Sequence, residues 1–290
     1  MAIQTLSHGF WQIMTLFRVF WGFIESDTFT LAIPNTAFGI FGAFASDHLV
    51  EGYKPWLELS YSAIIHRILH VLAFNIGNIF IFTLANQRLP SSVSEDRINK
   101  PWRPIPRGSI TMDQTRRLML CAIPLVLALD YMVGGDEVIC REVILAIAYG
   151  LFNSGSLLIA TGLDSQLSSL GLTWIVIISG TILMTMQIQD LKDQNGDKVR
   201  NRKTIVLYFG ETFSRASVAS FVCFWCSVCG GFWKSGLLVT SFTTSVAFII
   251  SLRVLLFRSP ESDARTWKLW CFWHASLYTL PYLSMGGLKA

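Results

Sequence analysis

Long segments without a single charged residue constrain this chain more than any other feature. They cover residues 28–46, 68–87, 143–163, 165–189, 216–233, 235–252 and 269–288, with a shorter one at 118–129. Most reach or approach the ~20 residues that a helix needs to cross ~30 Å of hydrocarbon, and none alternates like a strand of a membrane barrel. Only 14% of the residues are charged, against ~25% in soluble domains. This composition excludes a nucleic-acid binder and a disulfide scaffold, and it predicts an all-α polytopic membrane protein.

The basic residues predict the topology of this helical bundle. Of the 23 Lys and Arg residues, seven lie within 88–117 and five within 192–203, and a third cluster follows at 253–268. The positive-inside rule places all three loops on the cytosolic side. An even number of crossings must then separate the first two loops, and we expect four short ones with a break near residues 153–155. The prediction is a single domain over residues 1–290 with about nine helices, a cytosolic N-terminus and the C-terminus on the opposite face.

The second basic loop also carries three carboxylates. Asp190, Asp193 and Asp197 follow the spacing i, i+3 and i+7, which puts them on one face of a helix that has just left the membrane. Their mutual repulsion is relieved by a divalent cation, and oxygen ligands interspersed with lysines suit Mg²⁺ bridging to a phosphate group. The simpler alternative is a solvated charge run beside the membrane.

The first basic loop combines acids with anion-binding side chains. Glu95 and Asp96 are followed by Lys100, Arg103 and Arg107, and the arginine fork matches phosphate geometry. Prolines at 101, 104 and 106 exclude a helix there, so we expect an extended segment. The alternative for this loop is binding of anionic lipid headgroups.

Both loops resemble motifs of one family. The stretch DRINKPWRPIP at 96–106 resembles the DRxNKPxRPxP segment of the UbiA superfamily of intramembrane prenyltransferases, and 190–204 resembles its second motif, DxxDxxGD followed by a basic residue and Thr. The resemblance implies a nine-helix bundle whose central cavity lies under the cytosolic loops. It also implies Mg²⁺-dependent ionisation of an isoprenyl diphosphate in that cavity.

The first motif departs from the usual family pattern, NDxxDxxxD. Ser92 and Leu89 stand where acids are expected, and the preceding helix ends on Asn86 and Gln87. Tyr149, which in prenyltransferases of the family tends to be followed four residues later by a basic residue, is followed here by Asn153. A first motif altered in this way resembles that of the fungal membrane-bound terpene cyclases of the superfamily.

The resemblance therefore implies a sesquiterpene cyclase that ionises farnesyl diphosphate. Asp190, Asp193 and Lys192 are the expected catalytic residues. The expected Mg²⁺ ligands are Asn86, Glu95, Asp96, Asp190, Asp193 and Asp197, and the expected diphosphate-binding residues are Lys100, Arg103, Lys192 and Lys198. Aromatic side chains would shield the allylic cation, with candidates at Phe38, Phe41, Phe44, Phe80, Tyr149 and Trp174.

Two other functions stay open. An aromatic prenyltransferase would use the same diphosphate site and add an acceptor pocket, whereas a non-catalytic or transport protein would bind phospholipid headgroups. For any of the three we expect an integral protein of the endoplasmic reticulum membrane, with no nucleic-acid partner and no obligate protein partner.

Several smaller features receive structural interpretations. His66 and His70 have the spacing of a helical metal pair, but five histidines are too few for a membrane di-iron enzyme. Cysteines 223, 226 and 229 are expected to pack as small hydrophobic side chains. Arg67 is expected to snorkel from the non-cytosolic end of its helix, and Asp130, within an apolar stretch, receives no role.

Overall fold

The computed structural model describes residues 2–52, 58–122, 138–162 and 165–288, nearly all of them helical. Asp130 lies outside these residues. The N-terminal half contains α1 (Ala2–Asp27), the π-helix η1 (Thr28–Ala32), α2 (Ile33–Phe44), α3 (Ser46–Leu49), α4 (Tyr61–Gln87), α5 (Pro90–Asn99) and α6 (Met112–Ala122). The remainder contains α8 (Val138–Thr161), α9 (Ser169–Thr185), the 3₁₀ turn η3 (Met186–Gln189), α10 (Asp190–Arg200), α11 (Ile205–Phe209), α12 (Glu211–Trp233), α13 (Leu237–Leu256), α14 (Pro260–Leu277) and α15 (Leu280–Leu288). Two-residue strands, β1 (Val50–Glu51) and β2 (Gln166–Leu167), pair antiparallel.

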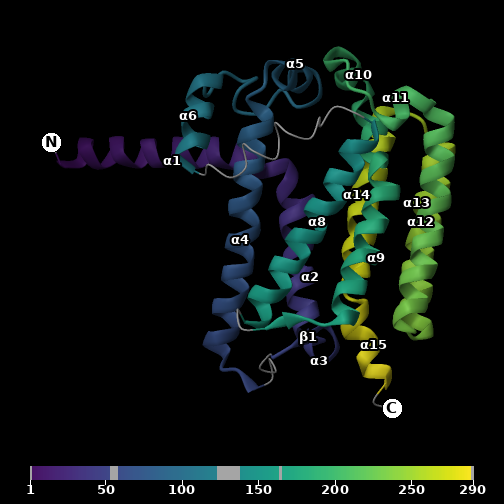
Figure 1. Cartoon of the computed structure of the whole chain (residues 1–290). Coiled ribbons are helices and arrows are strands. Elements are labelled where there is room, and N and C mark those ends of the chain that lie inside the picture. The colour runs from purple at the N-terminus through teal and green to yellow at the C-terminus, as the bar shows by residue number, and fades with distance from the viewer. Residues whose placement is uncertain (1, 53–57, 123–137, 163–164, 289–290) are drawn as a thin grey trace.

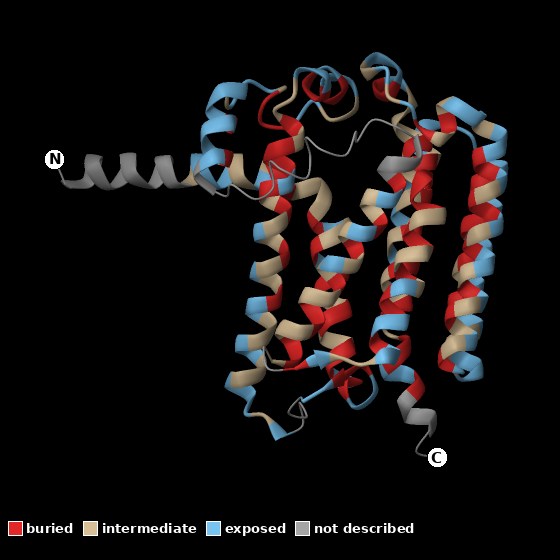
Figure 2. Cartoon of the chain, viewed as in Figure 1, coloured by how far each residue is buried: buried red, intermediate tan, exposed pale blue. Residues whose placement is uncertain are grey.

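Five helical segments among the described residues are long and apolar enough to cross a membrane. They are α4, residues 142–161 of α8, the continuous segment Ser169–Arg200 that contains α9, η3 and α10, then α12 and α13. Their outward faces carry exposed apolar side chains, such as Leu151, Val176 and Leu238 at 65%, 61% and 87% exposure, while buried residues face the bundle (Figure 2). The predicted all-α membrane protein is confirmed, and the count of nine helices stays a prediction.

All three basic loops lie at one end of the bundle (Figure 1). Helices α5 and α10 and the turn between α13 and α14 meet at this end, which we call the loop end, and the chain reaches the opposite end at α15. Helix α1 runs out sideways at the level of the loops. The three loops thus share one end of the bundle and α15 lies at the other, as the parity argument required, while the cytosolic side stays a prediction.

The predicted break near residues 153–155 is wrong, because α8 continues without interruption from Val138 to Thr161. Ser154 donates through Oγ to the carbonyl of Gly150 in its own helix at 2.7 Å. Buried Asn153 donates through Nδ2 to Tyr278 Oη at 3.3 Å. These polar groups find partners without leaving the helix, so polarity alone did not mark a helix end. Helix α8 runs away from the loop end and α9 returns to it (Figure 1), which is already an even number of crossings.

Small and polar residues set the close packing of α2, α4 and α8. A Cβ added at Gly39 would come within 2.5 Å of the backbone oxygen of Ser156, so α2 and α8 touch backbone to backbone. Between them, Asn75 of α4 donates to Thr36 Oγ1 at 3.1 Å and to Ser156 Oγ at 2.9 Å. Close contact through small residues with buried hydrogen bonds is typical of helix pairs in membranes.

Arg67 lies at the end of the bundle opposite the loops, as expected, but it does more than snorkel. Its Nη1 donates to the carbonyls of Ala160 and Thr161 at 3.0 and 2.9 Å. These are among the last carbonyls of α8, which have no partner within the helix. The guanidinium therefore caps α8, a partnership between helices that are distant in sequence.

Candidate active site

Helix α5 begins the predicted site, in a segment that the sequence presented as a loop. Pro90 occupies the first turn of this helix, where its missing N–H costs nothing. The segment after it is compact rather than extended as predicted. Arg103 donates its backbone N–H to Lys100 O at 3.1 Å, and Arg107 donates to Arg103 O at 3.0 Å. The prolines exclude a long helix, but they allow these successive turns.

Helix α10 carries the second motif, and its predicted helical face is confirmed. It packs against the end of α5 through Gly196, where an added Cβ would lie 2.1 Å from Asn99 Nδ2. Asn99 in turn donates to the backbone oxygen of Asp193 at 3.3 Å. The two motifs, about 100 residues apart in sequence, are therefore in direct contact at the loop end.

Glu95 is held by two arginines from the end of the second motif. Arg200 Nη1 lies 3.2 Å from Glu95 Oε2 and donates to Ser92 Oγ at 2.7 Å. Arg202 Nη2 lies 3.4 Å from the same carboxylate oxygen, and its Nη1 lies 3.1 Å from Asp197 Oδ1. Asp197 is fully buried. Of the acids predicted as metal ligands, Glu95 is thus ion-paired across the two loops and Asp197 is ion-paired within its own loop.

Asp96 is held within its own loop. Arg103 Nη1 donates to both carboxylate oxygens of Asp96, at 2.8 and 3.0 Å, and both side chains are buried. On its other side, Arg103 Nη2 lies 3.9 Å from Asp27 Oδ2, at the end of α1. Arg103 therefore joins the first motif to the N-terminal helix.

The cationic part of the site forms around Lys100. Burial lowers the pKa of Lys100, the positive charges of Arg103 and Lys192 lower it further, and the carboxylates of Asp193 and Asp27 act in the opposite direction. Lys192 Nζ contacts the carboxylate of Asp193. Three predicted diphosphate-binding residues and one predicted metal ligand thus lie together.

The other predicted residues are placed less centrally. Asn86 ends α4 and accepts a hydrogen bond from Ser92 Oγ at 3.4 Å, and Asp190 is buried at the start of α10. Lys198 is exposed. Its role in diphosphate binding stays a prediction.

The donor set restricts how a metal ion would be held. Within the described part of the chain, no three His, Cys, Asp or Glu residues group closely enough to bind one. The predicted set of six ligands is therefore not assembled. Mg²⁺ is commonly bound by one or two carboxylates together with substrate phosphates, and Asp190 and Asp193, one turn apart on α10, fit that smaller requirement.

Sequence reasoning missed Asp27, Arg200 and Arg202. Asp27 immediately precedes the charge-free segment 28–46. This position at the edge of the membrane could have predicted that Asp27 lies near the loops. The arginines stood in the basic run after Asp197, but only the packing of α10 on α5 shows which acids they meet.

A column of aromatic rings runs along α14 below the loops. Trp267 stacks on Trp270 and Trp270 on His274, with ring centroids 4.9 and 5.0 Å apart. His274 meets Tyr278 edge-on at 4.7 Å and Tyr149 at 6.1 Å. The sequence prediction included only Tyr149 of these residues. The spacing 270, 274, 278 was a signal for the others, because it places them on one helix face.

The other predicted aromatics are divided between this column and distant contacts. Phe38 packs on Tyr278 with centroids 5.0 Å apart, whereas Phe41 and Phe44 pack on Tyr282 of α15, and Phe80 on Phe20 and Phe23. Trp174 stacks on Phe232 and lies 16 residues before Asp190, roughly 24 Å away along the helix. Where Phe38, Tyr149 and Tyr278 meet, all three are at most 2% exposed, so the interior is filled there and the central cavity stays a prediction.

The smaller motifs form no further site. His66 and His70 are ring neighbours at 4.0 Å and both are exposed. Cys226 and Cys229 are buried free thiols, as expected for core packing, and Cys223 is exposed.

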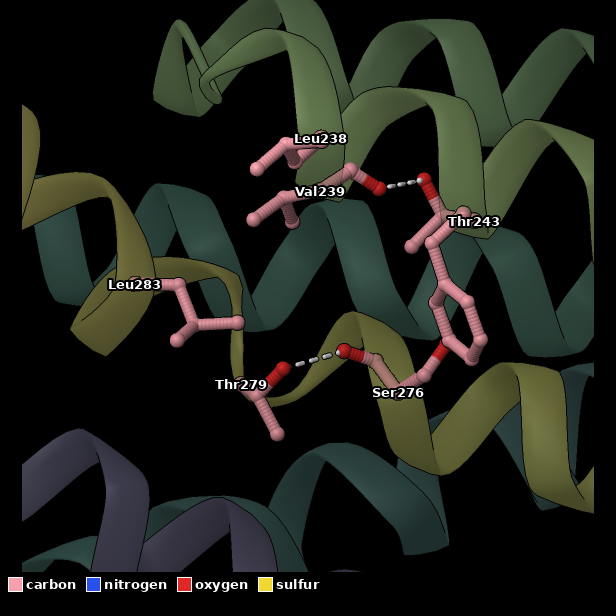
Figure 3. A pocket seen from close by; sticks show the side chains of 7 residues that line it. Leu238, Val239, Thr243, Ser276, Thr279 and Leu283 are labelled. Atoms are coloured by element: carbon pink, nitrogen blue, oxygen red, sulfur yellow. Dashed lines mark hydrogen bonds between the residues drawn. The ribbon is translucent and has the colours of Figure 1, made fainter.

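A hollow of about 240 Å³ lies between α13 and the α14–α15 segment, and Figure 3 shows the side chains that line it. Its lining is Leu238, Val239, Phe242, Thr243, Ser276, Thr279 and Leu283. Thr243 and Thr279 donate to carbonyls within their own segments, Val239 O at 3.0 Å and Ser276 O at 2.8 Å. The hollow adjoins the beginning of α13, at the opposite end of that helix from the basic loops, so it is not the predicted diphosphate site.

Comparison with known proteins agrees with this arrangement. Residues 136–277 match the model of the UbiA prenyltransferase family. The chain is 27% identical over 293 residues to the diterpene cyclase eriG of Hericium erinaceus, covering 93% of this chain and 90% of that protein. It is 29% identical to the somaliensene A/B synthase of Streptomyces somaliensis (91% and 93% covered), and 26% identical to the polyprenyl transferase eriF of Hericium erinaceus (96% and 99% covered).

A solved structure shares the fold. It is described as giving structural and mechanistic insights into the biosynthesis of digeranylgeranylglyceryl phosphate synthase in membranes, and it superposes with a TM-score of 0.53 over 96% of this chain and 100% of that chain, at 16% identity. The family match, the relatives and the fold agree with the two contacting motifs at the loop end. Over residues 136–277 the chain is thus similar to the UbiA prenyltransferase family, within a helical bundle that has membrane-spanning helices.

Proposed function

We propose that the protein is an intramembrane terpene cyclase that ionises farnesyl diphosphate, closes the carbon chain to a sesquiterpene and releases diphosphate. The observation that carries this proposal is the convergence of Lys100, Arg103 and Lys192 with Asp193 where the two motifs meet. Cations gathered from two loops match the charge of a diphosphate. The first motif, in which Ser92 and Leu89 replace acids, favours a cyclase over a transferase.

Binding the diphosphate is the task of the cations at the loop end. Lys100 and Lys192 would donate to its oxygens, and Arg103, held in place by Asp96, would present the remaining edge of its guanidinium. Asp190 and Asp193 would hold Mg²⁺, which supplies Lewis-acid neutralisation of the leaving group when bound. Together these groups stabilise negative charge as it develops on the departing diphosphate.

Loss of diphosphate breaks the carbon–oxygen bond, and both electrons leave with the oxygen. The allylic cation that remains must be kept from water while the chain folds, closes a ring and loses a proton to give the neutral hydrocarbon. Aromatic faces attract cations by ~0.5–2 kcal/mol each, and the column on α14 with Tyr149 presents such rings below the loops. An apolar surround also prevents capture of the cation by water.

The alternative within the family is transfer of the isoprenyl group to an aromatic acceptor. The similarity to the polyprenyl transferase eriF keeps this alternative in view. A non-catalytic protein that binds phospholipid headgroups through the same basic loops is the third candidate. The expected setting is the endoplasmic reticulum membrane with the loop end in the cytosol, and no obligate protein partner is inferred.

Product analysis separates these functions. Membranes containing the protein are incubated with Mg²⁺ and C10, C15 or C20 diphosphates, with and without a phenolic acceptor. The proposal predicts a cyclic hydrocarbon from the C15 substrate without acceptor. A product that forms only when the phenol is present would establish the transferase. The absence of any turnover by folded protein would favour headgroup binding.

A further inference from the structure

Every acid of the first motif already has an arginine partner. Asp96 is bound by Arg103, and Glu95 by Arg200 and Arg202. Both carboxylates are buried, at 2% and 9% exposure. A metal ion bound at either carboxylate would therefore have to share it with an arginine.

The pair around Glu95 differs from that around Asp96 because it joins two loops. Glu95 lies on α5, whereas Arg200 ends α10 and Arg202 follows it. Arg200 also donates to Ser92 one turn earlier on α5. Arg202 meets Asp197 as well as Glu95, so two carboxylates and two guanidiniums form one connected and largely buried network.

The local backbone is shaped to bring this network together. Asn201 has a left-handed conformation, with φ 56°, which ends α10. The Arg202 N–H donates back to the carbonyl of Asp197 at 2.9 Å. The chain therefore reverses directly after Arg200, and Arg202 is returned to the side of α10 that carries Asp197. Asparagine adopts this backbone conformation more readily than most residues.

The structure assigns Glu95, Asp197, Arg200 and Arg202 to an ion-pair latch that fixes α10 against α5, in place of the metal-binding role predicted for the two acids. The latch sets the distance between Lys100 and Arg103 on one loop and Lys192 and Asp193 on the other. Its members are positioning residues for the diphosphate site, so their kinetic role rests on the proposed function. Their role in holding the loops together does not.

Physical reasoning favours this assignment over metal binding. Arginine forks pair with carboxylates in a geometry that is rigid and charge-assisted. Removing one member of a buried pair leaves an uncompensated charge, which is strongly destabilising. A latch therefore predicts loss of stability and a coupling between its members, whereas a ligand predicts loss of metal affinity.

The test uses the purified full chain in detergent. Glu95→Gln, Arg200→Gln and the double variant are compared by melting temperature without metal. The latch predicts that each single change lowers the melting temperature by ~5 °C or more and that the double variant costs less than the sum. The reversed pair, Glu95→Arg with Arg200→Glu, should recover part of the loss. Asp113→Asn and Arg116→Gln, exposed on α6, are controls expected to leave the melting temperature unchanged.

Metal affinity is measured separately, with Mn²⁺ as the probe, by electron paramagnetic resonance in the presence of inorganic pyrophosphate. Glu95→Gln should keep the wild-type affinity, whereas Asp193→Asn should lose about tenfold or more. Arg200→Lys, which keeps the charge without the fork, should remain folded and raise the KM for farnesyl diphosphate. If Glu95→Gln does not fold, Arg200→Lys provides the test of the latch.

The outcomes separate the latch from the proposed function. Additive melting temperatures, or a loss of Mn²⁺ affinity in Glu95→Gln equal to that in Asp193→Asn, would overturn the latch. Coupled melting temperatures in a protein that turns over no isoprenyl diphosphate would retain the latch and reject the proposed function.

Discussion

At the scale of single residues, Lys100 links the electrostatics of the site to a measurable pH dependence. Burial, together with Arg103 and Lys192, lowers the pKa of Lys100 from the ~10.4 of a free lysine. The side chain therefore loses its proton, and with it its attraction for diphosphate, at a lower pH than an ordinary lysine. Bound diphosphate opposes this loss, because an anion favours the charged form.

As the pH rises, the free enzyme should thus lose affinity for substrate at a lower pH than the one at which the enzyme–substrate complex loses activity. We expect kcat/KM for farnesyl diphosphate to fall at a lower alkaline pH than kcat does, since the first reports the free enzyme. In Lys100→Arg this alkaline limb should disappear, because arginine stays charged. Both profiles can be measured by diphosphate release. An unchanged alkaline limb in Lys100→Arg would remove Lys100 from this role.

Residue chemistry was predictable from the sequence where the two recognised motifs supply the charged groups. Lys100, Arg103, Lys192 and Asp193 were expected in the site, and they lie together. The partners of Glu95 and Asp197 were not predictable, because the choice between a metal ion and an arginine depends on the turn at Asn201 and on the contact between α5 and α10.

At the scale of elements, the approach of α10 to α5 depends on Gly196. An added Cβ would lie 2.1 Å from the Asn99 side-chain nitrogen and 2.5 Å from its Cγ. A side chain at position 196 would displace the Asn99 side chain and break its hydrogen bond to the Asp193 carbonyl. The contact places the carbonyl of Asp193 within reach of Asn99.

Gly196→Ala should therefore destabilise the protein although alanine is the better helix former. Overpacking of this kind costs ~1–3 kcal/mol, and we expect a lower melting temperature together with a higher KM. Gly230→Ala, on α12 with open space around the added Cβ, is the matched control and should be neutral or stabilising. A neutral Gly196→Ala would show that the two helices are not held at this distance, and recovery in Gly196→Ala with Asn99→Ala would identify the clash.

Elements were predicted well where they are long and apolar. The helix of the second motif was also expected, from the spacing of its acids. Helix α5 was missed because its sequence, PSSVSEDRIN, has little apolar periodicity, and its helix is stabilised by Pro90 at the start and by packing against α10. The break predicted in α8 was wrong for a different reason. Asn153 and Ser154 are residue types typical of turns, but their side chains form hydrogen bonds inside the bundle.

At the scale of the whole molecule, the distribution of charge predicted the arrangement better than any local pattern. Basic residues in three separate loops required those loops to share a face, and they meet at the loop end (Figure 1). The prediction that the loops share a face is correct although the break predicted in α8 is wrong. Two crossings and four crossings both return the chain to the same face. The interior could not be predicted in the same way, since the ring column on α14 depends on which helix faces meet.

The proposed cyclase ionises a diphosphate at this end of the bundle without an acceptor. The most direct measurement follows purified protein with farnesyl diphosphate and Mg²⁺ alone, and records released diphosphate and cyclic hydrocarbon in the same samples. The account predicts equal amounts of both, and a loss of both by ~100-fold or more in Asp193→Asn, with Asp113→Asn as the control. Diphosphate release that waits for an aromatic acceptor, or that yields farnesol in place of a cyclic hydrocarbon, would contradict it.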